Sequence, residues 1–346
     1  MSLKDREPDG LLVLPHVRVQ NANAISSPLT HGFPSMTAFL GFMWALGRKL
    51  AAADIPLKLE KVGVICHWHQ EQTQDGYVRT FRLSRNPVDK DGSTAAIVEE
   101  GRIHLDLTLV FQLKMVKKPG ETHLLFQSDE ALRKEIAGAI RDMVGTMRIA
   151  GGSVLPPQSG PGVRVTPTLI GWPDQEEERH ALFRRLRRQW LPGFTLVGRD
   201  DLLQQRLEQL RLQTPDTTAL DAWLDLSRFN YRSSRNEKDR VVWTHDRPEG
   251  AGWIVPIPVG YAALSELYAG GQVANARDQS TPFRFVEGVY SIGQWISPHR
   301  LQRIRDLLWW GESHDDGLYR CCNGYEPLPV DDDEYPSHPP MSAETL

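Results

Sequence analysis

The sequence predicts an α+β fold built on a sheet in its first half, and three observations support this. Residues 103–113 alternate apolar and polar side chains, which is typical of a strand with one face in the core. Residues 36–50 and 129–147 each carry an apolar stripe at helical spacing. The order strand, helix, strand, long hairpin, strand, helix is compatible with a ferredoxin-like sheet.

Each element follows from a local pattern. A first strand is expected over residues 11–20, where Pro15 implies a break, a bulge or an edge position. Pro34 and Ser35 open the first helix, so its free amides should point back at the preceding loop. Further strands and helices are expected at 60–68, 176–190 and 201–213, followed by short strands and Gly/Pro-rich loops between 241 and 300.

Composition bounds the class of protein. A chain of 346 residues with 40% hydrophobic content can bury a substantial core, and no apolar run approaches the roughly 20 residues that a membrane-spanning helix needs. We therefore expect a cytoplasmic protein that does not contact a membrane. Cys66, Cys321 and Cys322 form neither a disulfide framework nor a metal-binding spacing, so reduced thiols and no cofactor are expected.

The charge balance places any attraction to nucleic acid at local sites. The net charge is −4, but six of the 44 acidic residues lie in the last 21 residues, which contain no Lys or Arg, so that 40 basic and 38 acidic residues remain before them. Thirty of the basic residues are arginine. The planar guanidinium suits phosphate oxygens and base edges, although a GC-rich genome would produce the same bias.

The most informative segment is QNANAISSPLTHGFP, residues 20–34. Asn21 and Asn23 each offer a donor and an acceptor that can match a base edge, and Ser26 and Ser27 can donate to phosphate. The small residues between them let a backbone come close. An ordinary connection between a strand and a helix has the same composition, and from composition alone the two interpretations are about equal.

This segment also carries a resemblance to a known family. QNANAISSPLT followed by GFPS resembles the handle-capping subunit of type I-F CRISPR surveillance complexes, the second Csy subunit. Further matching segments, in order, are NPVDKDGSTAAIVEEGR at 86–102, RIAGGSVLP at 148–156, LPGFTLV at 191–197, GWIVPIPVGY at 252–261 and NARDQSTPFRFVEG at 275–288. The resemblance spans about residues 11–320. The family pattern has tryptophan where His31 stands, which leaves the stacking role of this position in doubt.

The resemblance implies both fold and function. It implies an RRM-like RNA-binding core over residues 1–172 with a thumb insertion at about 70–101. The residue pattern itself predicts a helical and mixed region over 173–325, and the Pro-rich, acidic composition after residue 325 predicts a disordered tail over 326–346. The resemblance also implies a noncatalytic subunit that binds and caps the 5′ handle of CRISPR RNA. Its partners would be the large PAM-reading subunit and the first backbone subunit, and it would meet target DNA through the assembled complex.

Several segments are candidate RNA contacts, each with a plain alternative. Gly151 and Gly152 resemble a glycine-rich loop that approaches the RNA backbone. Gly151 could also end the preceding helix as a left-handed cap, which is compatible with that role, and both are expected together. The insertion at 70–101 resembles a thumb over guide RNA, or is a solvated hairpin. Arg277 and Arg284 lie near Phe283 and Phe285 and could bind phosphate beside stacked bases, or this segment could be core with a buried arginine paired with Asp278.

Two further patterns are weaker. Arg184, Arg185, Arg187 and Arg188 should face outward from their helix and could hold phosphate or an acidic partner, although a solvated face is at least as consistent. His67 and His69 lack a third ligand with suitable spacing, so two solvent-side histidines are expected and no metal. The expected RNA-binding residues are Gln20, Asn21, Asn23, Ser26, Ser27, His31, Arg79, Arg82, Arg85, Arg102, Arg148, Gly151, Gly152, Ser153, Arg277 and Arg284.

Two rival functions remain open from the sequence. The chain could cleave precursor CRISPR RNA, with His31 or His16 as general base and Tyr77 or Lys90 nearby, although no spacing specifies such a site. It could also be a protein scaffold that does not contact RNA. The nucleotide-binding and hydrolase motifs GxxxxGK and GxSxG are absent from the sequence.

Overall fold

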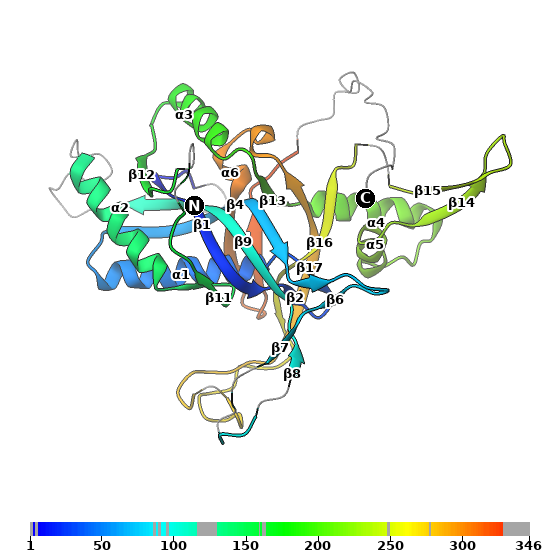
Figure 1. The fold of residues 1–346 in the computed structure, drawn as a ribbon, viewed down its shortest axis with the longest axis horizontal. Helices are drawn as coiled ribbons and strands as arrows, with labels where there is room; N and C mark the ends of the chain where they lie inside the picture. Colours follow the sequence, from blue (N-terminus) through cyan, green and yellow to red (C-terminus); the bar gives the residue numbers. More distant parts are fainter. Residues whose placement is uncertain are drawn as a thin grey trace.

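The computed structural model describes residues 3, 6–85, 88, 91–94, 97–115, 130–158, 160, 164–247, 250–276 and 278–327. Its fold is mixed α+β, with a large antiparallel sheet that carries helices on both faces (Figure 1). The predicted fold class is therefore confirmed at this level. Residues 328–346, which hold most of the predicted acidic tail, lie outside the described residues.

The first half follows the predicted order of long elements. The three strands are longer than expected, because their ends extend past the alternating segments into polar residues. Pro15 lies in a bulge, since the register of the first strand shifts between Leu14 and Val17. The elements are β1 Gly10–Asn23, α1 Met36–Ala52, β4 Leu57–Glu71, β9 Arg102–Met115 and α2 Glu130–Gly145.

Short strands join these elements and form the loops around them. Two small hairpins arise from the predicted insertion, and one follows β1 directly. The short strands are β2 Ile25–Ser27, β3 Thr30–His31, β5 Thr73–Gln74, β6 Thr80–Phe81, β7 Leu83–Arg85, β8 Ile97–Glu99, β10 Arg148–Ile149, β11 Gly152–Val154 and β12 Thr168–Gly171.

The second half contains more sheet than the sequence predicts. The segment 241–300 forms two paired strands of 11 residues each, where short strands were expected. Pro256 and Pro258 in the first of them and two glycines in the second interrupt the hydrophobic pattern, so the region resembles loops. The strands are β13 Phe194–Gly198, β14 Tyr231–Arg235, β15 Val241–His245, β16 Trp253–Ala263, β17 Val286–Ile296, β18 Leu308–Ser313 and β19 Tyr319–Asn323.

The helices of this half lie on the sheet or beside it. Both predicted helices are present, and a short helix that the sequence analysis missed follows them. The helices are α3 Glu176–Gln189, α4 Asp200–Gln213, α5 Ala219–Leu226, α6 Ile304–Leu307 and the 3₁₀ helix η2 Pro298–Arg300. No described helix is long and apolar enough to span a bilayer.

Strand β4 joins the two halves into one sheet. The order in the first half is β11, β1, β9, β4, and all of these pairings are antiparallel. The other edge of β4 pairs with β13 through Ile65 and Cys66, and with β18 through Val62 and Gly63. Strands β13, β17, β16, β19 and β18 therefore leave β4 and return to it as a closed ring.

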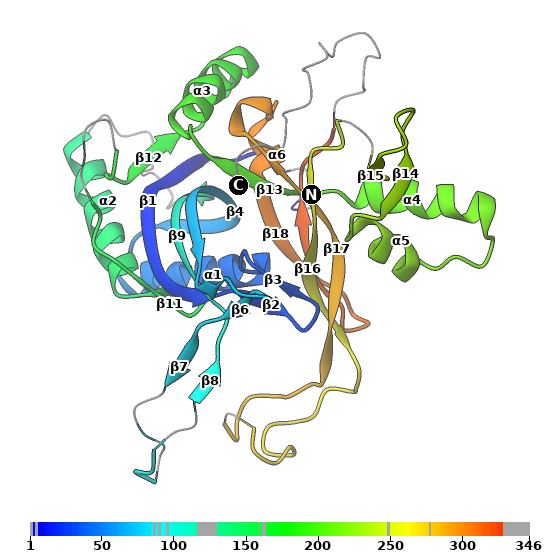
Figure 2. The ribbon, with the colours of Figure 1, turned by 45° about the vertical axis from the view of Figure 1, so that its right-hand side comes forward.

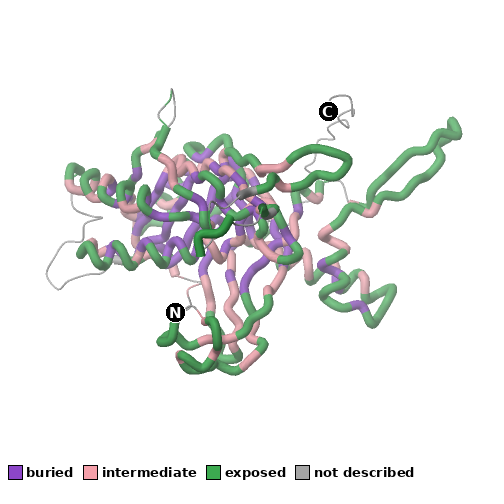
Figure 3. Tube along the Cα trace, turned by 60° about the horizontal axis from the view of Figure 1, so that its bottom comes forward, coloured by how far each residue is buried: buried purple, intermediate pink, exposed green. Residues whose placement is uncertain are grey.

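The core has two main layers, one on each face of the sheet (Figure 3). One layer packs α1 and α2 on β1, β9 and β4, and includes the fully buried Phe39 and Phe111. The other packs Leu182, Phe183 and Leu186 of α3 against Leu11 and other residues of the opposite face. This arrangement leaves the connecting loops at the ends of the strands exposed.

Two helix ends differ in how well the sequence predicts them. Ser35 caps α1 as expected, since its Oγ accepts a hydrogen bond of 3.3 Å from the Thr37 amide. Helix α2 ends at Gly145, two residues before the predicted end, and residue 129 lies outside the described residues. Gly151 therefore does not cap this helix, and that prediction is wrong.

Candidate RNA interface

The loop of residues 20–34 is a small hairpin held by its own hydroxyl groups. Strands β2 and β3 pair antiparallel. The side-chain oxygen of Thr30 lies 2.8 Å from Ser26 Oγ and 2.7 Å from Ser27 Oγ. Ser27 Oγ also accepts from the Leu29 amide at 3.1 Å. Both serines that were expected to donate to phosphate thus already take part in local hydrogen bonds.

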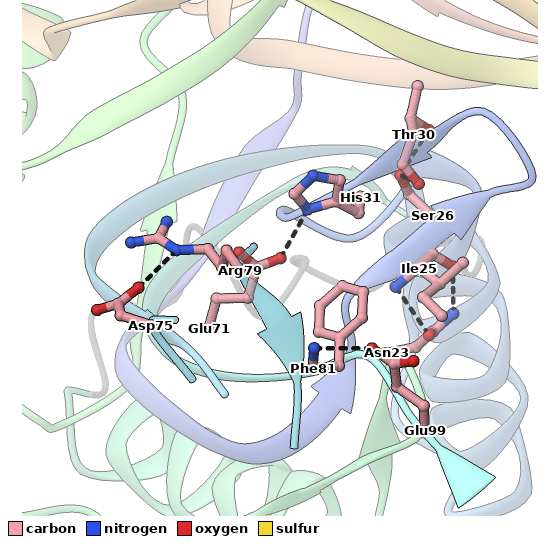
Figure 4. A network of polar contacts seen from close by, with 10 residues as sticks. All are labelled: Asn23, Ile25, Ser26, Thr30, His31, Glu71, Asp75, Arg79, Phe81 and Glu99. Atoms are coloured by element: carbon pink, nitrogen blue, oxygen red, sulfur yellow. Dashed lines mark hydrogen bonds and ion pairs between the residues drawn. The ribbon is translucent and has the colours of Figure 1, made fainter. Parts of the chain in front are cut away.

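The two asparagines of this loop have different surroundings. Asn23 Nδ2 donates to the Ile25 carbonyl at 2.7 Å, and its Oδ1 accepts from the Ile25 amide at 3.1 Å, so both ends of this amide have partners within the loop (Figure 4). Asn21 has φ 55 and its backbone amide donates to His104 Nδ1 at 3.1 Å. Its exposed side chain has no hydrogen-bond partner among the described residues.

The glycine-rich segment at 148–153 packs directly against this loop. Strands β10 and β11 form a hairpin, and Ala150 and Gly151 occupy its turn with φ 48 and 76, as a two-residue turn of this type requires. A Cβ at Gly152 would lie 2.7 Å from the Ala22 nitrogen, so this glycine allows two segments of the chain to touch. The Asn23 amide donates to the Ala150 carbonyl at 2.8 Å.

The contact between these two segments leaves a row of free polar groups. Gln20 of β1 lies directly opposite Ser153 of β11. Both side chains are exposed and, like that of Asn21, have no partner among the described residues. Arg148 Nη1 donates to the Gly151 carbonyl at 3.1 Å, which leaves most of its donors free on the exposed surface. This group of amide, hydroxyl and guanidinium side chains can bind an anionic, hydrogen-bonding polymer.

His31 lies between the loop and the insertion. Its Nδ1 is 2.9 Å from Glu71 Oε1, and its ring meets Phe81 edge to face with 5.7 Å between ring centroids (Figure 4). The side chain nevertheless remains 65% exposed. One ring face is therefore open to a stacking partner, with Glu71 fixing the orientation of the ring.

The arginines of the insertion are partly paired. Arg79 Nε donates to Asp75 at 3.0 Å, and Arg102 binds both carboxylate oxygens of Glu100. Arg82 contacts Gln72 at 3.3 Å. Arg85 belongs to β7, but its side chain is not described. Sequence reasoning could not detect these local acidic partners, because they come from turns whose geometry the sequence does not specify.

The segment 264–285 carries the last predicted contacts. Arg284 is half-buried, its Nε has no hydrogen-bond partner among the described residues, and its guanidinium packs at Gly317. Asp278 instead accepts four hydrogen bonds from Ser280 and Thr281, which lower the pKa of its carboxyl to about 2. Among the described residues, these bonds stand in place of an ion pair between Asp278 and an arginine. Arg277 lies outside the described residues.

The segment 264–285 and the hairpin β7–β8 extend from the same end of the molecule (Figures 1 and 2). Each exposes large apolar side chains, of which sequence analysis singled out only Phe285. On the hairpin these are Leu83, 70% exposed, and Ile97, 59% exposed. The other segment exposes Leu264, Leu267 and Phe285. An apolar surface of this kind is typical of a protein–protein contact.

The histidines of β4 were predicted incorrectly in part. His69 is exposed as expected, but His67 is half-buried and stacks on His16 with 4.4 Å between centroids. Its Nδ1 lies 2.7 Å from the Pro192 carbonyl and its Nε2 lies 2.7 Å from Thr108 Oγ1. Burial is the main cause of a lowered His67 pKa. The bulge between Cys66 and Trp68 separates the surroundings of the two histidines.

The remaining candidates lie away from this region. In the arginine cluster of α3, Arg184, Arg185 and Arg188 are exposed, whereas Arg187 donates to the Leu301 carbonyl at 2.5 Å. The described residues contain no group of three or more metal-ligating side chains. Burial raises the pKa of the Cys66 and Cys321 thiols to about 12, so both are protonated at neutral pH.

Comparison with known proteins identifies the family. The family model described as CRISPR-associated protein (Cas_Csy2) matches residues 12–321. CRISPR-associated protein Csy2 of Pseudomonas aeruginosa (strain UCBPP-PA14) is 45% identical over 333 residues, which cover 92% of this chain and 96% of that protein. The family-model match includes the loop of residues 20–34 and the hairpin β10–β11. The chain therefore belongs to the Csy2 family of CRISPR-associated proteins, the second Csy subunit of type I-F systems.

Proposed function

We propose that this chain is a noncatalytic RNA-binding subunit of a type I-F surveillance complex. In this role it binds and caps the 5′ handle of CRISPR RNA together with the large PAM-reading subunit. The first backbone subunit stacks beside it, and target DNA is recognised by the guide in the assembled complex. Family membership supports a place in the Csy complex.

One observation carries the proposal for the RNA handle. Two segments about 130 residues apart meet where Gly152 touches Ala22, and this contact places Gln20 opposite Ser153, with the exposed Asn21 next to Gln20 in the chain. None of the three side chains is needed for a hydrogen bond within the described fold. Their amides and hydroxyl can therefore serve base edges, while Arg148 contacts phosphate.

The surrounding fold supports the same role. The strand order β11, β1, β9, β4 with α1 and α2 on one face is the order of an RRM-like core, which we propose for this half of the chain. The glycine turn at 150–151 is open, since a Cβ at Gly151 would meet no atom within 4 Å. A phosphate backbone can approach this turn closely. The hairpin β7–β8 is in the place of the proposed thumb.

The side chain of Asn21 provides the sharpest test. Asn21→Gly removes the amide but keeps the φ of 55, which glycine adopts without strain. We expect preference for handle RNA over scrambled RNA to fall by about 1 to 3 kcal/mol. The measurement is fluorescence anisotropy on the chain copurified with its large-subunit partner, over a salt series.

The control is Asp54→Gly, at another exposed position with φ 55 beyond the end of α1. It should leave the preference unchanged. Equal handle preference in the Asn21→Gly and wild-type proteins would contradict the role of Asn21. Equal and steeply salt-dependent binding of both RNAs by the wild type would instead indicate phosphate attraction alone and favour a scaffold role.

The endoribonuclease alternative gains no support from the geometry. His16 binds Asp106 at 3.0 Å and His31 binds Glu71, and no described contact joins either histidine to Tyr77. Lys90 lies outside the described residues. Cleavage products from a precursor transcript incubated with this subunit alone would overturn the noncatalytic assignment.

A further inference from the structure

The hairpin β14–β15 is a projecting element that the proposed handle site does not use. It extends from α4 and α5, away from the end that carries β7–β8 and the segment 264–285 (Figures 1 and 2). Every residue from 231 to 246 is exposed. Among the described residues, the two strands form a two-stranded sheet of their own. An isolated two-stranded hairpin is only marginally stable in water, so packing alone does not account for this exposed element.

The base of the hairpin is anchored firmly. Asn230 Nδ2 donates to Asp246 at 2.5 Å. Arg247 donates to the carbonyls of Leu226 and Ile254, and its guanidinium lies 4.1 Å from the centre of the Phe229 ring. The helix below is fixed in turn, because Trp223 Nε1 donates to the Ser291 carbonyl of β17. The hairpin is therefore held at a defined position with its faces uncovered.

One face of the hairpin is aromatic. Cross-strand pairs place Tyr231 beside His245 and Ser233 beside Trp243, so these side chains point to the same side. Phe229 extends the row, since its ring stacks on Tyr231 at 6.2 Å between centroids. Trp243 is 64% exposed and Tyr231 is 61% exposed. Flat ring faces of this kind are open to stacking.

The same element is strongly basic within a chain of negative net charge. Residues 228–247 contain six arginine or lysine residues and three acidic residues. The side chains of Arg228, Arg232, Lys238 and Arg240 have no hydrogen-bond or ion-pair partner within the described part of the chain. Arg235 is paired with Asp239 at 2.7 Å and Arg247 is used at the base. Four free cations thus lie on the same hairpin as the exposed rings, and Arg232 is on the opposite strand face from Tyr231 and Trp243.

We propose that the hairpin β14–β15 is a second nucleic-acid site, which binds a single strand by stacking its unpaired bases on Trp243 and Tyr231. The free cations of the hairpin contact phosphates of the same strand. Single strands fit better than duplex, because a duplex presents no open base faces to the exposed rings. The four unpartnered cations favour a nucleic-acid ligand over a protein partner. The centre of a protein–protein interface is apolar and depleted of charged residues, so the cations would lie in its rim.

The test uses the full-length chain and fluorescein-labelled oligo-dT of 12 nucleotides, measured by anisotropy. Trp243→Ala should weaken binding about tenfold, in line with the loss of one stacked base. The charge variant Arg232→Gln with Arg240→Gln should reduce the slope of log K against log salt by about 1.4, for two lost phosphate contacts on a single strand. Both substitutions lie on an exposed hairpin, and circular dichroism checks that the fold persists.

The matched control is Trp44→Ala. Trp44 is 72% exposed on α1 and lies beside a cation, since Arg48 is 5.7 Å from its ring centre, but it is not on the hairpin. Its replacement should leave oligo-dT binding unchanged. The proposal is overturned if Trp243→Ala binds oligo-dT like the wild type. It is also overturned if duplex DNA binds the wild type as tightly as oligo-dT does and Trp243→Ala leaves that duplex binding unchanged.

The outcome separates this site from the handle site and from a protein contact. Hairpin variants should leave the preference for handle over scrambled RNA intact, whereas Asn21→Gly should lower that preference and leave oligo-dT binding intact. Failure of one result does not decide the other. If Trp243→Ala instead prevents copurification with the large subunit and leaves oligo-dT binding unchanged, the hairpin is a protein-docking surface and the proposal is wrong.

Discussion

The loop of residues 20–34 and the hairpin β14–β15 are both rich in polar side chains, but they use them differently. In the loop, Asn23, Ser26 and Ser27 have hydrogen bonds within the loop itself, and Asn21 is free. On the hairpin, four cations have no partner among the described residues, and the rings of Trp243 and Tyr231 remain 64% and 61% exposed. Side chains of the types that bind ligands are therefore available to a ligand only where they are not already hydrogen-bonded within the local fold.

The largest effect should come from the contact that builds the loop surface. Gly152→Ala would place a Cβ 2.7 Å from the Ala22 nitrogen and from Val19 Cγ1, and backbone cannot move away cheaply. We expect a loss of roughly 3 kcal/mol in the free energy of unfolding, at the upper end for overpacking. Urea denaturation measures it.

Gly151→Ala is the matched control at the neighbouring residue. Its φ is 76 but its Cβ would meet open space, so the cost is backbone strain of about 1 kcal/mol. Equal losses for the two variants would show that Gly152 does not hold the two segments in contact.

A smaller effect is expected from the hydroxyl that closes the loop. Thr30→Val removes the oxygen shared by Ser26 and Ser27 and should cost about 1 kcal/mol of unfolding free energy. Ser153→Ala removes an exposed hydroxyl without a described partner and should leave stability unchanged. Thermal denaturation of the two variants measures this difference. Equal midpoints would contradict the distinction between the hydrogen-bonded Thr30 hydroxyl and the Ser153 hydroxyl without a described partner.

The smallest effect should be a pH dependence at His67. Burial lowers its pKa in the folded state, so the unfolded chain takes up the proton first as the pH falls. Stability should decrease as the pH drops below about 6.5, the usual histidine value. His67→Gln should reduce the difference in unfolding free energy between pH 7.5 and 5.5, whereas His69→Gln, at an exposed position, should not. An unchanged difference in His67→Gln would contradict the assignment.

Long periodic segments made the fold predictable. The apolar stripes of α1 and α3 and the alternation of β9 show in the sequence because each buries one face. Strands β16 and β17 were missed because Pro256, Pro258 and internal glycines resemble turns, although here they lie in a long pair. The ring around β4 depends on pairings between distant segments, which no local pattern encodes.

The sequence was sufficient to identify the segments that form the candidate site. It was not sufficient to tell which of their side chains are free of hydrogen bonds within the fold. The sequence singled out both the loop and the glycine pair, and the structure places them in contact. It could not show that Asn23 binds Ile25 or that Arg102 binds Glu100, because these bonds depend on turn geometry. The signal for the hairpin β14–β15 was present, since Arg and aromatic residues are interspersed there, but no core pattern drew notice to it.

The shared edge of β4 has a consequence for biosynthesis. That strand is complete at residue 71, but its second neighbours come from residues 194–198 and 308–313. At the usual speed of translation the last of them follows roughly 10 to 50 s later. During this interval the edge of an apolar strand has no partner in its own chain and can pair with another nascent chain. The yield of folded protein should therefore depend more on how promptly a chaperone covers this strand edge than on the stability of the finished fold.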